Sequence, residues 1–396
     1  FVEELPPKSL KKLGEAFAEG VRSGLNDRQF LTEASMVTAF ASPRRLAVHM
    51  SAVVSTSPDR EHVERLMPVS VALGGDGKPT AALRKRVEKI GRGALLDQWP
   101  DSEDGPDRLY VASDGKGDAV FFRTLASGGP LGLGLLAALE DTLESLPIAK
   151  RMTYQLGDGW STVDFVRPVH GVVVLHGASL VHLHLLGLDS GRLTHGHRFE
   201  AVTPVLSINH ADQYADQLRT EGAVIASFAE RREEIARQLD AAARKQGLTP
   251  INDAALLDEV TALVERPNVL LCRFDEEFLG VPPECLILTM KANQKYFPLL
   301  DPQGKLTNKF LIVSNIRPDD PSRVIEGNER VVRPRLADAK FFFDQDRKKT
   351  LVSRVPGLAK VVYHNKLGTQ GERVERVRAI ARAIGEQLGG PALAAL

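Results

Sequence analysis

The side chains whose types and spacing best suit a chemical role lie in residues 323–351. The cations that matter in this segment are Arg330, Arg333, Arg335, Lys340, Arg347, Lys348 and Lys349. Arginine can hold phosphate oxygens through two parallel hydrogen bonds, whereas lysine acts as a mobile point charge. Because an α-helix completes one turn in about 3.6 residues, Arg330, Arg333 and Lys340 would lie near one side of the helix. The pattern predicts a partly buried helix whose exposed side binds a polyanion such as structured RNA.

A second group of basic side chains flanks an aromatic ring at Lys291, Lys295 and Tyr296. This ring could stack on a base while the two ammonium groups contact phosphates. Packing inside the protein is the alternative for this group. For the cations of 323–351 the alternative is neutralisation within the chain by three nearby carboxylates, Asp338, Asp344 and Asp346. Both alternatives stay open at the level of sequence.

Nucleotide-binding signatures are weak. Residues 74–80, GGDGKPT, place a glycine before a lysine but lack the spacing that lets backbone amides surround a phosphate. Neither the signatures of class I aminoacyl-tRNA synthetases nor a class II motif with ATP-binding arginines is evident. We therefore predict no catalytic and no cofactor-binding residue in this chain, and expect that it does not activate an amino acid alone.

Metal ligation is not predicted either. His182 with His184, and His195 with His197, could each offer two imidazoles on one strand face. No third ligand follows at a spacing typical of a zinc site. The two cysteines, Cys272 and Cys285, cannot form a four-cysteine site, and their apolar surroundings predict small core residues.

Charge is distributed unevenly although the 396 residues sum to a formal net charge of zero. Residues 321–396 carry 15 Lys and Arg against 8 Asp and Glu, whereas the rest carries 36 against 43. A basic C-terminal fifth indicates a phosphate-containing partner. No apolar run approaches the length of about 18 residues that a membrane span needs, so we expect a cytoplasmic protein without a membrane partner.

These side chains must be positioned by a mixture of helices and strands. Apolar residues recur at helical spacing in 8–25, 80–90, 228–246 and 371–388, and alternate in 34–40, 45–54 and 269–274. From residue 325 strand signals nearly vanish, and Leu336, Ala339, Phe342 and Phe343 indicate an amphipathic helix. The pattern predicts an α+β multidomain fold in which two mixed domains, 1–148 and 149–322, precede the start of an all-helical domain, 323–396.

Several sequence blocks, in order along most of the chain, resemble one family. They include EELPPKSLKKLGEAF at 3–17, SGRLTHGHRF at 190–199, MKANQKYFPLLD at 290–301, GNERVVRPRLADAKFFFDQD at 327–346 and VVYHNKLGTQGERVERV at 361–377. In these blocks the chain resembles the beta subunit of the two-subunit bacterial glycyl-tRNA synthetase. The resemblance implies that a few leading residues precede this sequence. It also implies that the rest of a helical His-Asp-type domain and an anticodon-binding domain follow it.

The resemblance implies a division of labour. An alpha subunit would hold the class II site where ATP, Mg²⁺ and glycine form the adenylate, and the beta subunit would bind and position tRNA-Gly in an alpha2beta2 heterotetramer. Segment 149–322 is similar, more weakly, to a domain of phenylalanyl-tRNA synthetase beta subunits. Two other functions stay open. One is a tRNA-editing hydrolase with a polar pocket around His195, His197 and Arg198, and the other is a subunit-docking scaffold without RNA contact.

Overall fold

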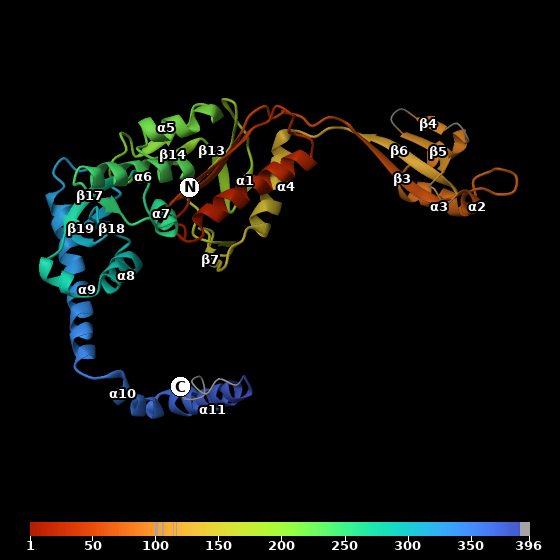
Figure 1. The fold of residues 1–396 in the computed structure, drawn as a ribbon. Helices are drawn as coiled ribbons and strands as arrows, with labels where there is room; N and C mark the ends of the chain where they lie inside the picture. Colours follow the sequence, from red (N-terminus) through yellow and green to blue (C-terminus); the bar gives the residue numbers. More distant parts are fainter. Residues whose placement is uncertain (100–101, 105–106, 114, 116, 389–396) are drawn as a thin grey trace. The chain divides into compact units, whose positions relative to one another are not determined.

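A computed structural model describes residues 1–99, 102–104, 107–113, 115 and 117–388 of the chain. The chain forms two compact units. Unit 1 comprises Phe1–Ile235 and Leu257–Pro267, and unit 2 comprises Ala236–Leu256 and Asn268–Leu396. The predicted α+β fold is confirmed, because helices alternate with several small sheets in both units (Figure 1). Within the described part of the chain, no helix is long and apolar enough to cross a membrane.

The helical core of unit 1 is formed by α1 (Leu10–Asp27) and α4 (Leu131–Ser145), which lie side by side (Figure 1). Helix α1 buries one face because its apolar residues recur every three or four positions. The two helices approach closely at a glycine. A Cβ atom on Gly24 would stand 2.6 Å from the Cβ of Ala138. The helix predicted at 8–25 is thus confirmed, with its boundaries shifted by two residues.

Beside these helices lie short strands. The pair β1 (Val37–Ser42) and β2 (Arg45–Met50) is antiparallel and turns at Pro43 and Arg44, as the alternating pattern predicts. The remaining short strands of this region are β7 (Met152–Gln155), β8 (Thr162–Phe165), β9 (Val172–Val173), β10 (Leu175–His176), β11 (Ser179–Leu180), β12 (His184–Leu185), β13 (Leu188–Gly191), β14 (Leu193–His195) and β15 (Val205–Ser207). The helices that follow are α5 (Tyr214–Thr220), α6 (Phe228–Arg244) and α7 (Ala254–Thr261).

A second sheet of unit 1 has a core of its own. Its strand order is β3-β6-β5-β4, with α2 (Val69–Ala72) and α3 (Ala81–Lys89) nearby (Figure 1). Its strands are β3 (Arg60–Pro68), β4 (Ser102–Asp104), β5 (Asp107–Ser113) and β6 (Asp118–Ala126). Leu83 and Val87 of α3 are fully buried with Val120 of β6. The alternating pattern in the sequence did not indicate β3, whose residues are mostly charged or exposed.

A buried charge network holds unit 1 together. The guanidinium of Arg45 pairs with the carboxylate of Glu265, and both side chains are almost fully buried. Arg231 has no exposed surface and donates to the carbonyl oxygens of Ala41, at 2.8 Å, and Thr261, at 3.0 Å. Burial lowers the pKa of Arg231, while the neighbouring Glu265 carboxylate opposes this shift. Arginine suits this position because its five donors satisfy carbonyls from several segments.

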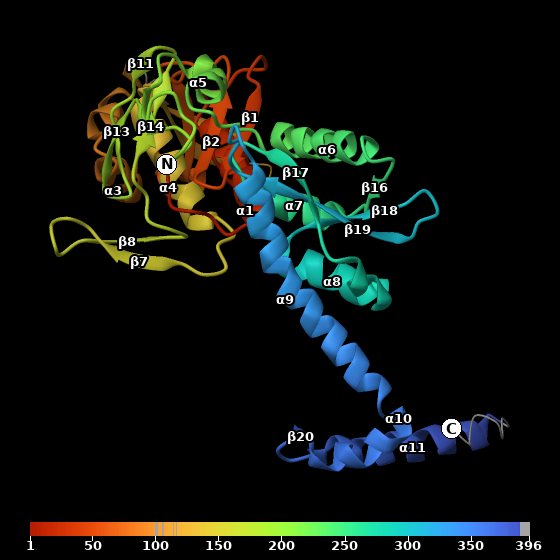
Figure 2. The ribbon, with the colours of Figure 1, turned by 90° about the vertical axis from the view of Figure 1, so that its left-hand side faces the viewer.

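Unit 2 is built on a four-stranded sheet of order β16-β18-β19-β17. The second half of α6 and helix α8 lie on opposite sides of this sheet (Figure 2). Its strands are β16 (Thr249–Pro250), β17 (Asn268–Arg273), β18 (Phe297–Leu300) and β19 (Leu306–Ser314). Its helices are α8 (Pro283–Gln294), α9 (Ser322–Arg347), α10 (Leu351–Arg354) and α11 (Gln370–Gln387), with the short strands β20 (Val362–His364) and β21 (Gly368–Thr369) between the last two.

Shared cores cross the segment boundaries that the sequence suggests. Leu146 and Phe165 belong to one cluster of unit 1, although the predicted boundary between residues 148 and 149 lies between them. In unit 2, Leu336 of α9 belongs to the same cluster as Phe310 of β19. The first turns of the helix expected to open a separate domain therefore complete the core of the sheet before them. Residues 389–396, which end the predicted segment 323–396, lie outside the described residues.

Candidate nucleic-acid interface

Helix α9 carries most of the predicted RNA-binding residues and is anchored along one face. Val332 and Leu336 are fully buried in the unit 2 core, and Ala339 and Phe343 pack against it. The remaining faces of the helix are free to present polar side chains to solvent. Pro334 lies inside the helix and removes the hydrogen bond that the carbonyl of Arg330 would otherwise accept.

Arg330 and Arg335 fit the predicted role best. Both side chains are exposed. Among the residues that the structure describes, neither has an acidic partner. A guanidinium without an intramolecular partner can form two hydrogen bonds with a phosphate group without first breaking an ion pair. The alternative of internal neutralisation therefore does not apply to these two arginines.

Internal neutralisation does apply to two other predicted residues. Arg333 Nε lies 3.0 Å from an oxygen of Asp275, and Lys340 Nζ lies 2.9 Å from an oxygen of Asp344. The hydrogen bond that Lys340 donates to the carboxylate of Asp344 raises the pKa of Lys340. These pairs remain half exposed, so a phosphate group could replace either carboxylate at a small energetic cost. Arg333 and Lys340 are therefore weaker candidates than Arg330 and Arg335.

The C-terminal end of α9 concentrates positive charge. Arg347 lies over the ring of Phe343, 5.6 Å from its centroid, and Lys348 and Lys349 follow in exposed positions. Cations are favoured there because the helix dipole places partial negative charge at this end. Lys340 lies seven residues after Arg333, and Arg347 lies seven residues after Lys340. Because seven residues make almost two full turns, these three side chains lie along one line of the helix.

Tyr296 occupies a core position. Its ring is 5% exposed and stacks on Phe310 with centroids 4.9 Å apart, while its hydroxyl contacts Asn328 at 2.7 Å. Burial raises the pKa of Tyr296 to about 12. A ring held in this way is not presented to a nucleic-acid base. Tyr296 thus packs inside the protein, which is the alternative that the sequence left open for this residue.

The two lysines before Tyr296 are also engaged. Lys291 forms an ion pair with Asp253, and this contact is the main cause of the lowered pKa of that carboxyl. Lys295 ends α8 in the left-handed conformation, with a φ of 59°, and its ammonium group donates to the carbonyl of Ala292 at 3.0 Å. These three side chains therefore differ from Arg330 and Arg335 of α9, because each of them contacts a partner within the protein.

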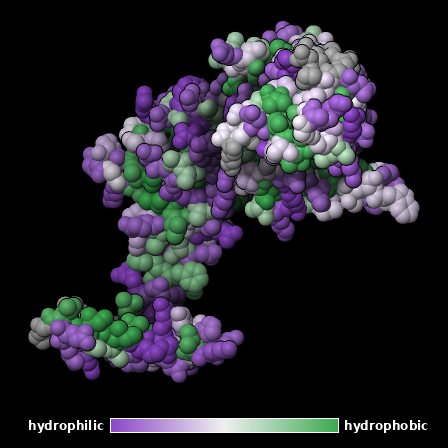
Figure 3. Space-filling view, turned by 90° about the vertical axis from the view of Figure 1, so that its right-hand side faces the viewer, coloured by the Kyte–Doolittle hydropathy of each residue, from purple (hydrophilic) through white to green (hydrophobic). Residues whose placement is uncertain are grey.

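Exposed aromatic rings on α9 were not predicted as binding groups. The sequence placed Phe342 on the buried face, and this was wrong: Phe341 is 56% exposed and Phe342 is 65% exposed. Their centroids are 5.5 Å apart in an edge-to-face arrangement. Hydrophobic surface is visible along α9 and near the C-terminal helices in Figure 3. The signal was the unbroken run of three phenylalanines, of which a helix can bury only part on one face.

Other chemistry considered from the sequence finds little support in the geometry. In the turn at 74–80, the amide of Lys78 already donates to the Asp76 carboxylate at 3.1 Å, and that of Gly77 donates to the carbonyl of Gly74. An acidic group inside a turn repels a phosphate, so these residues do not fit a triphosphate.

The two cysteines lie in different environments. Cys272 is buried as predicted, and burial raises its pKa to about 12. Cys285 is exposed, so its predicted core position was wrong.

The fold separates His195 from His197, whereas His182 and His184 are both exposed. His195 is exposed on β14, while His197 is buried and its Nε2 has no hydrogen-bond partner among the described atoms. His184 contacts Asp189 at 2.9 Å on the surface. Within the described ranges, no three His, Cys, Asp or Glu residues gather as a metal site would require.

Comparison with known proteins shows the family of the chain. A family model described as glycyl-tRNA synthetase beta subunit matches residues 1–395. The chain belongs to this family. It is 63% identical over 394 residues to the glycine–tRNA ligase beta subunit of Thiobacillus denitrificans, covering all of this chain and 55% of that protein. It is also 63% identical over 388 residues to the beta subunit of Leptothrix cholodnii, covering 98% and 53%.

A third relative, the glycine–tRNA ligase beta subunit of Dechloromonas aromatica, is 61% identical over 400 residues. The alignment covers all of this chain and 56% of that protein. The chain thus spans about half the length of the curated relatives it matches. The resemblance found in the sequence blocks is confirmed at the level of the family.

Proposed function

We propose that this chain is the part of a glycine–tRNA ligase beta subunit that binds tRNA-Gly and positions it for aminoacylation. One observation carries the proposal: α9 presents Arg330 and Arg335 to solvent without an acidic partner in the described part of the chain. The basic end of the helix and the exposed rings of Phe341 and Phe342 extend this surface. Phosphate groups and unstacked bases of a structured RNA are the ligands that such a surface recognises.

The proposed reaction is ATP + glycine + tRNA-Gly → glycyl-tRNA + AMP + diphosphate. Its bond-making steps would take place on a separate alpha subunit, which would also hold ATP and Mg²⁺. The turn at 74–80 does not fit a triphosphate, which supports this division. The contribution of the present chain would be to hold the acceptor end near the adenylate, because fixing two reactants together removes most of the entropic barrier to their encounter.

The proposal is tested by the salt dependence of tRNA binding in the full-length, two-subunit enzyme. The double variant Arg330→Gln, Arg335→Gln removes two phosphate contacts. The slope of log Kd against log salt concentration should therefore become shallower by about 1.5. The matched control is Arg22→Gln, Arg219→Gln, which removes two arginines that are paired with Glu19 and Glu230 in unit 1. An unchanged slope in the first variant, or equal changes in both, would contradict the proposal.

An editing hydrolase is less well supported. That function requires a polar pocket formed by His195, His197 and Arg198. In the structure His195 and Arg198 are exposed, whereas His197 is buried. Neither of the two cavities described below is lined by any of the three.

Subunit docking is a second candidate, favoured by the surface of α11. Its residues Val377, Ile380 and Ile384 are each more than half exposed and recur at helical spacing. The double variant Ile380→Asp, Ile384→Asp should abolish co-elution with the alpha subunit in gel filtration if this face binds it. If docking is the only role of the surface formed by α9 to α11, the Arg330 and Arg335 variant will bind tRNA normally. The two experiments therefore separate the candidates.

A further inference from the structure

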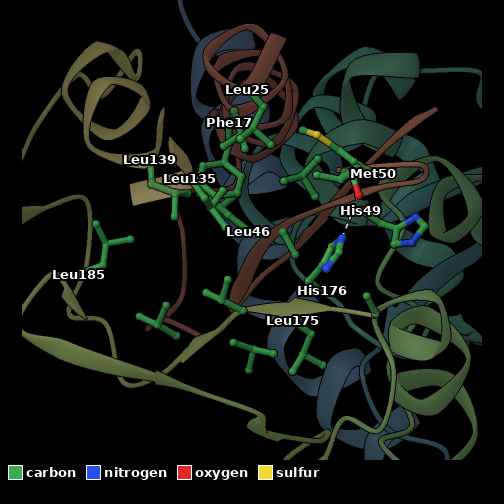
Figure 4. A pocket seen from close by; sticks show the side chains of 18 of the residues that line it. Phe17, Leu25, Leu46, His49, Met50, Leu135, Leu139, Leu175, His176 and Leu185 are labelled. Carbon is green, nitrogen blue, oxygen red and sulfur yellow. Dashed lines mark hydrogen bonds between the residues drawn. The ribbon is translucent and has the colours of Figure 1, made fainter. Parts of the chain in front are cut away.

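A large apolar cavity lies inside unit 1. Its volume is about 470 Å³, and its walls are α1, α4, β2 and residues 171–177. The side chains that line it are mostly aliphatic or aromatic, among them Phe17, Leu25, Leu135, Leu139 and Leu175 (Figure 4). Well-packed protein interiors contain few voids larger than a water molecule. A cavity of this size and character therefore indicates that an apolar occupant belongs there.

A second cavity lies against the same strands. It has a volume of about 120 Å³ and shares Leu46, Val48 and Val173 with the first. Its other walls differ: Thr194, Ile208 and Tyr214 line the second cavity, whereas α1 and α4 line the first. The two cavities thus lie on the two faces of one slot, which is bordered by β2 on one side and by residues 171–177 on the other. An extended chain in this slot would project alternate side chains into the two cavities.

Both borders of the slot have an open strand edge. Among the described strands, β2 pairs with β1 alone in a two-stranded sheet, and β9 ends a three-stranded sheet. The amide of Ser51 donates to Met36, on the β1 side. Because the N–H groups of successive residues in a strand point to opposite edges, the amides of Leu46, Val48 and Met50 face the slot. The amide of Val174 donates to Gly191 on the β13 side, so that of Val173 faces the slot as well.

The first residues of the chain already enter this slot. Val2 donates to the carbonyl of Arg44 at 2.9 Å, and Phe1 accepts from the amide of His170 at 2.8 Å. Leu5 then donates to Pro43, so the partner number falls as the chain number rises. The same holds on the other border, where Glu3 donates to Pro168. The segment is therefore antiparallel to both neighbours, and its continuation in the N-terminal direction points along the open edges.

The amino group of Phe1 is poorly placed for a charged terminus. It donates to the carbonyl of Gly171 at 2.8 Å, and it is buried next to Arg44 and Arg45. Burial, followed by repulsion from these two arginines, lowers the pKa of this amine to about 5. A peptide N–H at the same place would make the same hydrogen bond without burying a charge.

We propose that the slot holds a β-strand of about six residues, formed by polypeptide joined to the amino group of Phe1 and antiparallel to both β2 and β9. Alternate side chains of this strand fill the two cavities, with the larger apolar ones directed towards α1 and α4. The strand joins the sheet of β1 and β2 to that of β9, β13 and β12. This inference concerns the fold of unit 1 and is independent of the proposed RNA surface.

Hydrogen–deuterium exchange tests the proposal. The full-length chain with its native residues before Phe1 is compared with the chain that begins at Phe1. In the full-length chain the amides of Leu46, Val48, Met50 and Val173 should exchange at least about tenfold more slowly. The amides of β5 and β6 serve as the control. They belong to the four-stranded sheet of order β3-β6-β5-β4, away from the slot, and should exchange equally in both chains. Equal exchange at the four slot amides would overturn the proposal.

A second measurement identifies the occupant if the shorter chain folds poorly. In the full-length chain, each of the six residues before Phe1 is replaced in turn by Asp. The losses in Tm should alternate along the segment, largest at the positions that face α1 and α4. A flat profile would show that these residues lie outside the slot and would overturn the proposal.

A third measurement separates the proposed strand from a bound apolar molecule. The dye 8-anilinonaphthalene-1-sulfonate should bind the chain that begins at Phe1, and a synthetic peptide with the preceding residues should displace it. The full-length chain should not bind the dye in this slot. Equal dye binding by both chains, or equal displacement by a scrambled peptide, would overturn the assignment of the strand as occupant.

Discussion

Arginines of unit 1 and arginines of unit 2 lie in opposite environments. In unit 1, Arg45 and Arg231 are buried, and their donors are directed to Glu265 and to backbone carbonyls. In unit 2, Arg330 and Arg335 stand on the outer faces of α9 with no acidic partner in the described ranges. The same side chain therefore stabilises a fold in one unit and is available to a ligand in the other.

This difference is decided by desolvation. A buried guanidinium has lost its water and depends on every partner, so removing one partner leaves a charge that nothing compensates. An exposed guanidinium keeps its water, so its removal changes little in the free protein. Stability and ligand affinity should consequently respond to mutations at different places in this chain.

The largest expected effect is on the stability of unit 1. Glu265→Ala leaves Arg45 buried without its carboxylate and should lower the free energy of unfolding by about 3–5 kcal/mol. Urea unfolding can be followed by far-ultraviolet circular dichroism, because both units contain helices. Glu375→Ala, which breaks the exposed pair with Arg378, is the control and should change stability by less than about 0.5 kcal/mol. Similar effects of the two substitutions would remove the distinction between the units.

The next effect concerns the buried amine of Phe1 in the chain that begins there. Its pKa is about 5 in the folded chain and near 8 when exposed. Between these values the unfolded chain binds the proton more tightly, so stability should fall as the pH falls from 8 to 5, by at most about 4 kcal/mol. Urea unfolding across this range measures it. Acetylation of the N-terminus removes the titration of this amine and leaves that of the histidines. The difference between the acetylated and the free chain therefore measures the contribution of the amine. Identical pH profiles for the two forms would contradict the prediction.

A smaller effect is expected for the exposed rings of unit 2. Phe341→Ala together with Phe342→Ala should weaken tRNA binding by about 1–3 kcal/mol if one base stacks on this pair. Because both rings are more than half exposed, the stability of the free protein should stay nearly constant. Fluorescence anisotropy with labelled tRNA measures the affinity, and Leu133→Ala, at an exposed position of α4, is the matched control. Loss of affinity in the control variant would show that the effect is not local to α9.

The smallest effect should come from the half-exposed ion pair of Arg333 and Asp275. Asp275→Asn should change the free energy of unfolding by less than about 1 kcal/mol. The substitution frees the guanidinium, so tRNA binding should be unchanged or slightly stronger. A loss of stability above 2 kcal/mol or so would place this pair with the buried network of unit 1 instead.

Much of the local structure could be predicted from the sequence. The helices α1, α3, α6 and α11 and the pair β1–β2 follow from apolar periodicity, which depends only on neighbours in the chain. Strand β3 could not be predicted in this way. Its residues are mostly polar, and it is held by pairing with β6, whose residues come much later in the chain. Tertiary pairing overrode local preference there.

The candidate site was only partly predictable for the same reason. The sequence indicated that α9 is a cationic helix, because the type and spacing of Arg330, Arg333 and Lys340 are local properties. Which of its arginines have acidic partners was a tertiary property, since Asp275, the partner of Arg333, lies before α8. The burial of Tyr296 under Phe310 likewise depended on a strand that follows it.

By itself, the sequence determined that the chain is an α+β protein of the glycyl-tRNA synthetase beta subunit family with a basic C-terminal fifth. The tertiary structure alone decided which cations are buried, which are paired and which are exposed, and it alone revealed the slot beside β2. The physical reason is that composition and periodicity report on a residue and its neighbours. Burial and pairing instead depend on segments that are distant in the chain and meet only in the folded protein.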